Sequence, residues 1–120
     1  MFKVFIAGGD EVGDYDYFKE KCIYYLKDKA KSGEGIMILS TGDDFPNIFA
    51  ERYGIAIQEF YPDWNKYKNK ALSKRNESIF DKADAMIIFY NDNIIEHRIL
   101  KNEAMRKKVP MRIAPLKKEG

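Results

Sequence analysis

Short apolar runs alternate with segments of helical periodicity along the whole chain. In the segments between the runs, apolar side chains recur three or four positions apart, which is the spacing of an amphipathic helix. The runs themselves are too short for helices of this kind and fit buried strands. They lie at residues 2–7, 36–40, 55–61, 85–90 and 109–114. The pattern therefore predicts an α/β protein in which five strands are linked by four helices.

Capping residues sharpen the boundaries of the first two predicted helices. The first begins after the N-cap candidate Asp14 and ends at Ser32-Gly33, and its apolar stripe consists of Tyr15, Phe18, Cys22, Tyr25 and Leu26. The second has Pro46 near its first turn, Asp43 or Asp44 as its N-cap, and Gly54 just beyond its end. In the fourth helix, at about residues 94–107, the apolar residues are spread around the helix, so the pattern does not show which side faces the core.

Strands joined through helices pair in parallel, and their crossovers are right-handed. We therefore expect a single three-layer Rossmann-like domain with a mostly parallel five-stranded sheet in the order 3-2-1-4-5. Pro110 and Pro115 bound the last run, which suits an edge strand. The domain is expected to span residues 1–115, and residues 116–120 are expected to form a disordered tail.

The third predicted helix carries two polar residues on its apolar face. Arg75 and Asn76 fall in register with an inward stripe formed by Leu72, Ile79, Phe80 and Ala83. A buried guanidinium without a partner is costly, so an inward Arg75 implies an internal acceptor or a ligand. The alternative is that Arg75 extends its charged end to water and Asn76 bonds local backbone.

In an open parallel sheet, ligands bind outside the carboxyl ends of the strands, where the strand order reverses. Here that position corresponds to the loops that begin at Gly8, Thr41 and Asn91. Two of these loops offer small residues whose backbone or hydroxyl groups suit ligand contact. The candidate ligand-binding residues are Gly8, Gly9, Ser40, Thr41, Gly42, Arg75 and Asn76.

The glycines do not form a dinucleotide fingerprint or a P-loop. Acidic side chains crowd the same loops, namely Asp10, Glu11, Asp14, Asp43 and Asp44. This acidity favours ribose hydroxyls, a base edge or a cation over a triphosphate. Helix capping remains the plainer explanation for Asp14 and Asp44, because carboxylates stabilise helix N-termini.

Composition narrows the chemistry further. The single Cys22 and the single His97 have no metal-ligand spacing around them, so we predict no metal site and no cofactor. Cys22 is expected in the core, and His97 on the surface or in helix packing.

Residues 1–60 carry 7 basic and 11 acidic side chains, whereas residues 61–120 carry 14 basic and 8 acidic side chains. No apolar segment suits a membrane span or an export signal, so we expect a cytoplasmic protein without membrane contact.

Aromatic residues gather around the loop after the third strand. They are Tyr53, Tyr61, Trp64 and Tyr67. Such rings can stack a nucleobase, but they are more often simply core and rim. We expect Trp64 to plug the end of the sheet beside Pro62.

The order of these motifs resembles the YspA-like branch of the SLOG superfamily, whose Rossmann-like domains are related to DprA and to the LOG phosphoribohydrolases. The resemblance covers about residues 1–114. It is carried by VFIAGG (4–9), ILSTG (38–42), AERYGI (50–55), FYPDWNKY (60–67), KRN (74–76) and ADAMIIFY (83–90). It implies a domain that binds a nucleotide or a nucleotide-derived ligand, often as a sensor.

Several family positions are altered in this chain. The Gly-Ser-Arg that follows the first strand in the best-matching members reads Gly8-Gly9-Asp10 here. After the second strand, Ser40 and Gly42 remain, but residues 45–47 replace a further Gly-Ala-Asp. Asn91-Asp92-Asn93 stands where a Gly-Thr is usual, and the Pro-Gly-Gly-x-Gly-Thr-x-x-Glu signature of LOG activity is absent. These departures argue against cleavage of a nucleoside monophosphate.

Three hypotheses follow. The first is a non-catalytic domain that binds or senses a small nucleotide-derived ligand. The second is a hydrolase or transferase that acts on an N-glycosidic bond with Asp10, Asp43 or Asp44 as the working carboxylate. The third is a degenerate scaffold for protein or DNA contact through Arg106-Lys107-Lys108 and Arg112. Pairing of identical chains is a further expectation, whereas nucleic acid is the less favoured partner.

Overall fold

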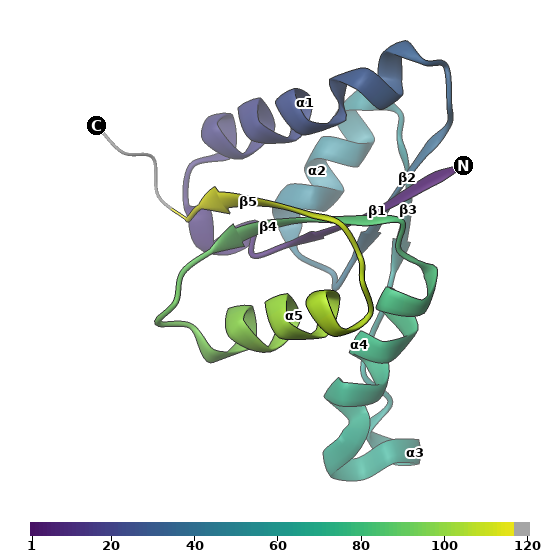
Figure 1. Cartoon of the computed structure of the whole chain (residues 1–120), viewed down its shortest axis with the longest axis vertical. Helices are drawn as coiled ribbons and strands as arrows, with labels where there is room; N and C mark the ends of the chain where they lie inside the picture. Colours follow the sequence, from purple (N-terminus) through teal and green to yellow (C-terminus); the bar gives the residue numbers. More distant parts are fainter. Residues whose placement is uncertain (117–120) are drawn as a thin grey trace.

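Five parallel strands form the central sheet of the computed structural model, which describes residues 1–116 (Figure 1). The strand order is β3-β2-β1-β4-β5, so the predicted order is confirmed. Val4 in the central strand pairs with Ile38 on one side and with Ala85 on the other. The strands are β1 (Phe2–Ala7), β2 (Ile36–Ser40), β3 (Ala56–Glu59), β4 (Ala85–Tyr90) and β5 (Met111–Pro115).

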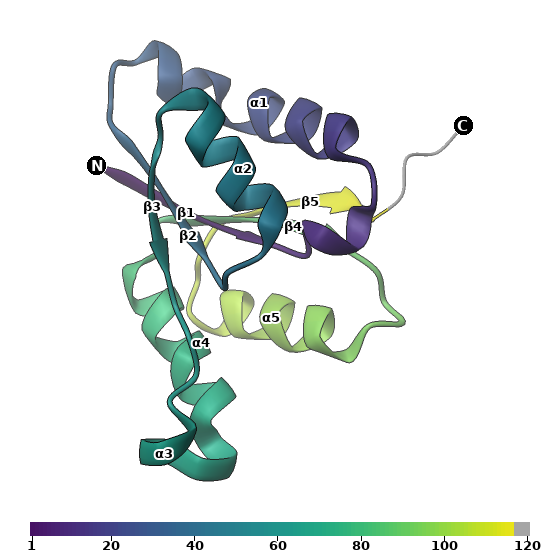
Figure 2. The same ribbon diagram turned by 180° about the vertical axis from the view of Figure 1, so that it is seen from behind.

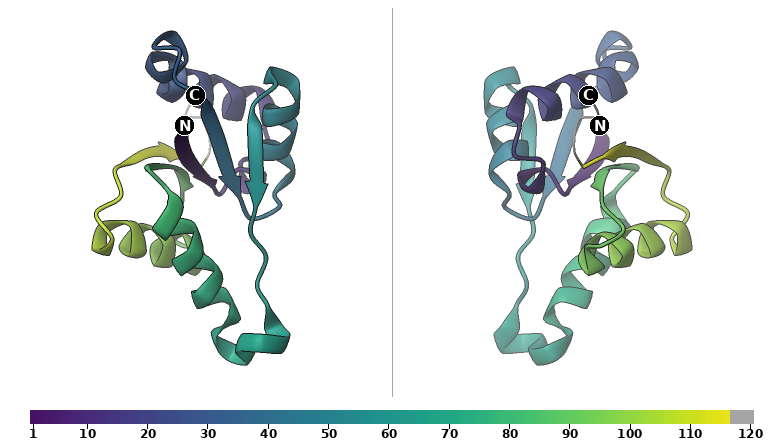
Figure 3. Two further views of the ribbon diagram at one scale, coloured as in Figure 1. Left: turned by 90° about the vertical axis from the view of Figure 1, so that its right-hand side faces the viewer. Right: turned by 90° about the vertical axis from the view of Figure 1, so that its left-hand side faces the viewer.

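Helices cover both faces of the sheet, as the predicted three-layer domain requires. The helices α1 (Tyr15–Lys31) and α2 (Asp44–Tyr53) lie on one face, and α4 (Ala71–Lys82) and α5 (Ile95–Arg106) lie on the other (Figures 1 and 3). Three shorter helical segments were not predicted. They are η1 (Asp10–Val12), α3 (Trp64–Tyr67) and η2 (Lys68–Lys70).

The core is divided by the alternation of side chains along the strands. Val4 and Ile6 pack under α1 and α2, whereas Phe5 and Ala7 pack under α4 and α5. Two predictions for individual residues of the first helix are confirmed. Cys22 is fully buried in the core, and the Asp14 carboxylate accepts a hydrogen bond of 3.2 Å from the backbone amide of Tyr17. The predicted ends of the first two helices are also confirmed.

The chain between β3 and α4 leaves the body of the protein. Residues 60–72, which we call the arm, run away from the carboxyl end of β3, turn at α3 and return into α4 (Figures 2 and 3). Trp64 lies on this arm with 53% of its surface exposed, so the prediction that it plugs the sheet end is wrong. Leu72 is also exposed, contrary to its predicted place on the inward stripe. Both errors arise because the chain projects outward after Phe60 instead of turning across the sheet.

The packed chain reaches slightly past the predicted domain boundary. Leu116 is buried, and its backbone amide donates a hydrogen bond of 3.2 Å to the carbonyl of Tyr90. The remainder of the predicted tail, residues 117–120, lies outside the described residues. Within residues 1–116, none of the helices combines the length and apolar character that crossing a membrane requires.

Candidate functional site

A small cavity lies where the strand order reverses between β1 and β4. Its volume is about 50 Å³, and the loops after β1 and β2 and the first turn of α5 form its walls. This is the position at which the sheet topology predicts a ligand. The lining residues are Phe5, Ala7, Gly8, Glu11, Thr41, Asp43, Glu96, His97 and Leu100.

Three carboxylates from separate elements line this cavity. Glu11 belongs to η1, Asp43 is the N-cap residue of α2, and Glu96 lies in the first turn of α5. Burial, followed by the nearby negative charges of Asp10, Glu11 and Glu96, raises the pKa of Asp43 from its ordinary value of 3.8 to about 6. A hydrogen bond with the Thr41 side chain opposes this rise in pKa. The Asp43 carboxyl therefore changes its charge close to neutral pH.

His97 forms the inner wall beside these acids. Its side chain is almost fully buried, its Nδ1 accepts a hydrogen bond of 3.1 Å from the backbone amide of Asn91, and its Nε2 pairs with the Glu11 carboxylate. The backbone of Gly8 passes directly against this ring. A Cβ atom at Gly8 would lie 2.5 Å from the carbonyl oxygen of Phe89 and 3.2 Å from His97 Nε2, and the φ of Gly8 is +76°. Only glycine fits there.

The N-terminus of α2 is already closed by an acidic side chain. The two carboxylate oxygens of Asp10 accept hydrogen bonds of 2.8 Å each from the backbone amides of Asp44 and Phe45. Asp43, the N-cap residue, makes no side-chain cap bond of its own. The helix-terminal amides that would bind a phosphate are thus occupied by Asp10.

Arg75 and Asn76 are both turned inward, as the helical register predicted. Asn76 is buried, and its Oδ1 accepts hydrogen bonds from Arg75 Nε at 3.2 Å and Nη2 at 3.0 Å. The side chain of Arg75 is only 9% exposed, and its Nη2 lies 3.6 Å from Glu96 Oε1. The internal acceptor required by the buried guanidinium is therefore supplied by Asn76 and Glu96. Glu96 lines the cavity, whereas Arg75 and Asn76 do not; they are connected to it through the contact between Arg75 and Glu96.

The other predicted residues divide into two groups. Gly8 and Thr41 line the cavity. Gly9, Ser40 and Gly42 instead serve the packing of the loops. A Cβ atom at Gly9 would lie 2.7 Å from the ring of Phe18, and one at Gly42 would lie 3.0 Å from the ring of Tyr61. The hydroxyl of Ser40 accepts a hydrogen bond of 3.0 Å from the amide of Gly42.

Sequence reasoning named Glu11 among the acids of these loops but did not select it, Glu96 or His97 as a ligand-binding residue. Glu96 and His97 lie in the first turn after the third candidate loop, and this position was the available signal. The smeared apolar face of that helix concealed that His97 points inward. Among residues 1–116, no group of three or more His, Cys, Asp or Glu side chains is arranged to hold a metal ion.

The basic stretch at the end of α5 is partly neutralised. Arg106 pairs with Glu103, and Lys107 Nζ lies 3.2 Å from the carboxylate of Asp81. Arg112 belongs to a different part of the surface, beside the first residues of β4 and β5. The four basic residues of the third hypothesis do not all line one site.

Comparison with known proteins gives no match to a family model, to a curated protein or to a solved structure. The resemblance to SLOG domains therefore stays a prediction from the sequence.

Proposed function

We propose that this protein binds the sugar portion of a small nucleotide-derived ligand at the cavity between Gly8, Asp43 and Glu96. The observation that carries the proposal is the presence of three carboxylates around a cavity at the topological switch point. Carboxylates accept hydrogen bonds from hydroxyl groups, so a ribose diol suits this lining. The small volume accommodates an edge of the sugar, and the rest of the ligand extends over the rim.

The same geometry disfavours recognition through phosphate. The amides at the start of α2 are held by Asp10, and the surrounding carboxylates repel a second anion. The guanidinium of Arg75, which contacts the cavity residue Glu96, is already engaged by Asn76 and Glu96. We therefore expect a nucleoside to bind as well as the corresponding nucleotide.

A thermal-shift titration with adenosine, 2′-deoxyadenosine and adenosine 5′-monophosphate tests this function. Adenosine is expected to stabilise the protein, by about 2.7 kcal/mol at a hundred times its Kd. Removal of the 2′-hydroxyl should weaken binding, and addition of the 5′-phosphate should not strengthen it. Absence of any shift with these compounds and with ADP-ribose at millimolar concentration would count decisively against the proposal.

The variant Asp43→Asn tests whether adenosine binds at the acidic cavity. It retains the size of the side chain and removes its negative charge, so adenosine should bind at least several-fold more weakly. Asp44→Asn is the matched control because the neighbouring Asp44 is exposed and does not line the cavity. Equal losses in both variants would place the ligand elsewhere.

A second candidate function is hydrolysis or transfer at an N-glycosidic bond. The observation in its favour is the pKa of Asp43, about 6, because a group that titrates near neutral pH can both accept and donate a proton. Asp10 is less suited to this role, since both of its oxygens cap α2. Incubation with deoxynucleosides and nucleoside monophosphates, followed by detection of free base, distinguishes the two functions. Activity that persists in Asp43→Asn would remove this candidate.

A further inference from the structure

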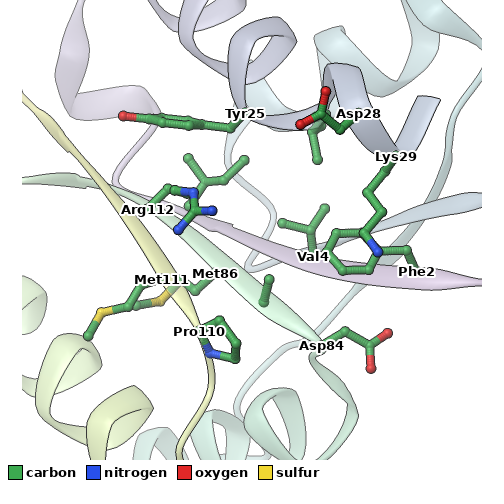
Figure 4. Close-up of a pocket in the computed structure, with 13 residues that line it drawn as sticks. Phe2, Val4, Tyr25, Asp28, Lys29, Asp84, Met86, Pro110, Met111 and Arg112 are labelled. Atoms are coloured by element: carbon green, nitrogen blue, oxygen red, sulfur yellow. The ribbon is translucent and has the colours of Figure 1, made fainter. Parts of the chain in front are cut away.

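A larger cavity lies at the opposite end of the sheet from the acidic site. Its volume is about 230 Å³, and it opens between the second half of α1 and the first residues of β1, β4 and β5 (Figure 4). Val4, Ala85 and Ile87 form its floor on the face of the sheet that α1 covers. The rings of Phe2 and Tyr25 stand at its sides.

Among residues 1–116, one of the two cations in this cavity, Arg112, lacks a hydrogen-bond or ion-pair partner. Arg112 on β5 extends its guanidinium toward the centre of the space, between Tyr25 and the side chains of the strands (Figure 4). Among residues 1–116, no hydrogen bond or ion pair engages that guanidinium. The register of β4 and β5 places Arg112 opposite Ile87, so its side chain leaves the sheet on the face that carries the apolar floor.

Of the other charged residues of the rim, Lys29 and Asp84 have partners, whereas the Asp28 carboxylate has none among residues 1–116. Lys29 Nζ lies 3.5 Å from the carboxylate of Glu34 and 4.7 Å from the centroid of the Phe2 ring, so this cation is already engaged. The carboxylate of Asp84 accepts a hydrogen bond of 2.9 Å from the backbone amide of Lys3. Asp28 adds a second negative charge at the rim. Within the described part of the chain, the cavity thus offers one cation without a partner, an apolar floor, two aromatic walls and an acidic margin.

We propose that this cavity binds a small aromatic or aliphatic monocarboxylate. A guanidinium matches a carboxylate with two parallel hydrogen bonds, and the apolar body of such a ligand would cover Val4, Ala85 and Ile87. A dianionic phosphate is disfavoured because Asp28 and Asp84 stand at the margin. Pockets for drug-sized ligands measure about 300–1,000 Å³, so a cavity of this volume selects a compact ligand.

The proposal concerns a site separate from the acidic cavity and does not depend on the function assigned there. None of the residues lining the acidic cavity lines this one. A ligand here would contact the amino ends of the strands, whereas the proposed sugar site lies at their carboxyl ends. Failure of one proposal would therefore leave the other intact.

The test uses phenylacetate, phenylacetamide and phenyl phosphate as probes in ¹H–¹⁵N NMR titrations of the full chain. These compounds share a phenyl ring and differ in the charge of the attached group. Phenylacetate should shift the backbone amides of Ala85, Met111 and Arg112 with a Kd in the millimolar range or below. Neutral phenylacetamide and dianionic phenyl phosphate should bind at least several-fold more weakly.

Two variants test separately the contribution of the Arg112 charge and the contribution of the open cavity volume. Arg112→Gln should weaken phenylacetate about tenfold and leave phenylacetamide nearly unchanged, because only the charge-assisted hydrogen bonds are lost. Arg98→Gln is the matched control, since Arg98 on α5 is exposed like Arg112 but does not line the cavity. Ala85→Leu should abolish binding of both probes by filling the floor.

Three results would overturn the proposal. The first is the absence of shifts at these amides with saturating phenylacetate. The second is an equal loss of affinity in Arg112→Gln and Arg98→Gln. The third is unchanged affinity in a folded Ala85→Leu protein, with folding verified from the dispersion of the same NMR spectra.

Discussion

Asp10 caps the helix that begins at Asp44, although the two residues are 34 positions apart in the chain. Its carboxylate spans the gap between the loop after β1 and the start of α2, and each oxygen accepts one backbone amide at 2.8 Å. This contact closes an anion site that the α2 terminus would otherwise present. It also places a negative charge near Asp43 and so contributes to the raised pKa of that residue.

Substitution Asp10→Ala should therefore have two effects. The loss of an N-cap carboxylate is expected to lower the free energy of unfolding by about 1 kcal/mol. The pKa of Asp43 should fall, because a neighbouring negative charge is removed. Urea unfolding and an NMR pH titration of the Asp43 carboxyl measure these changes.

The control for this prediction is Asp16→Ala. Asp16 is an exposed carboxylate in the first turn of α1, and its Oδ1 lies 4.0 Å from Lys19 Nζ. Its removal should change stability by less than about 0.5 kcal/mol. The capping role of Asp10 would be refuted by equal stability of the two variants.

The fold was accessible from the sequence because its determinants are local. The two periodicities, the cap at Asp14 and the glycine at Gly54 each depend on residues a few positions apart. With parallel strands and right-handed crossovers, few topologies remain. The strand order could be predicted for that reason.

The site was less accessible because its determinants act through space. Sequence spacing offered Asp43 or Asp44 as the N-cap of α2, and Asp43 holds that position, but the carboxylate that accepts the terminal amides comes from Asp10. His97 is buried because α5 packs against the sheet. The apolar pattern of that helix does not show which of its sides faces the sheet. The register of Arg75 and Asn76 was informative because both residues lie on one helix.

Protonation of Asp43 should make the stability of the protein depend on pH. Its pKa is raised from 3.8 to about 6 by burial and by neighbouring acids, so between these values the folded state binds more protons than the unfolded state. Stability should therefore fall as pH rises through this window. Because the group is only half-buried, solvent screening reduces the effect to about 1 kcal/mol.

Asp43→Asn should remove this dependence. Denaturant unfolding at a series of pH values between 4 and 8 should show the variant gaining stability relative to the parent protein as pH rises. Asp44→Asn serves as the control, because no such gain is expected at an exposed position. A constant difference between parent and Asp43→Asn across the series would show that Asp43 titrates normally.

Arg75 and Glu96 form an unequal ion pair. The Arg75 side chain is 9% exposed, whereas that of Glu96 is 58% exposed. Arg75→Ala should cost about 2 kcal/mol, because it leaves the buried Asn76 amide without its partner. Glu96→Gln should cost less than about 1 kcal/mol, since the lost charge is largely in contact with water.

Urea unfolding of both variants checks this asymmetry. The exposed neighbour Lys74 provides the control, and Lys74→Ala should be close to neutral, within about 0.5 kcal/mol. Equal costs for Arg75→Ala and Glu96→Gln would mean that the ion pair, and not the bond to Asn76, stabilises this region. In either case Glu96→Gln should lower the pKa of Asp43, because Glu96 is one of the charges that raise it.

Alanine substitutions at Gly8 and Gly13 distinguish the cost of a left-handed backbone from the cost of a steric clash. Their φ angles are +76° and +74°, but a Cβ atom at Gly8 would lie 2.5 Å from a carbonyl oxygen, whereas one at Gly13 would meet no atom within 4 Å. Gly13→Ala should cost about 1 kcal/mol through the left-handed backbone alone. Gly8→Ala should cost about 2 kcal/mol more, because the Phe89 carbonyl must move. Thermal unfolding resolves this difference, and equal values would contradict the close approach at Gly8.

The exposed position of Trp64 on the arm can be read from fluorescence, because it is the only tryptophan in the chain. With 53% of its surface exposed, its emission in the folded protein should lie close to that of the unfolded chain and be quenched readily by iodide. Trp64→Ala should change stability by less than about 0.5 kcal/mol, as expected for a surface residue. A blue-shifted emission that persists on dilution would instead place Trp64 in a packed environment within the same chain. A blue shift that appears only as protein concentration rises would identify the arm as the surface through which copies associate.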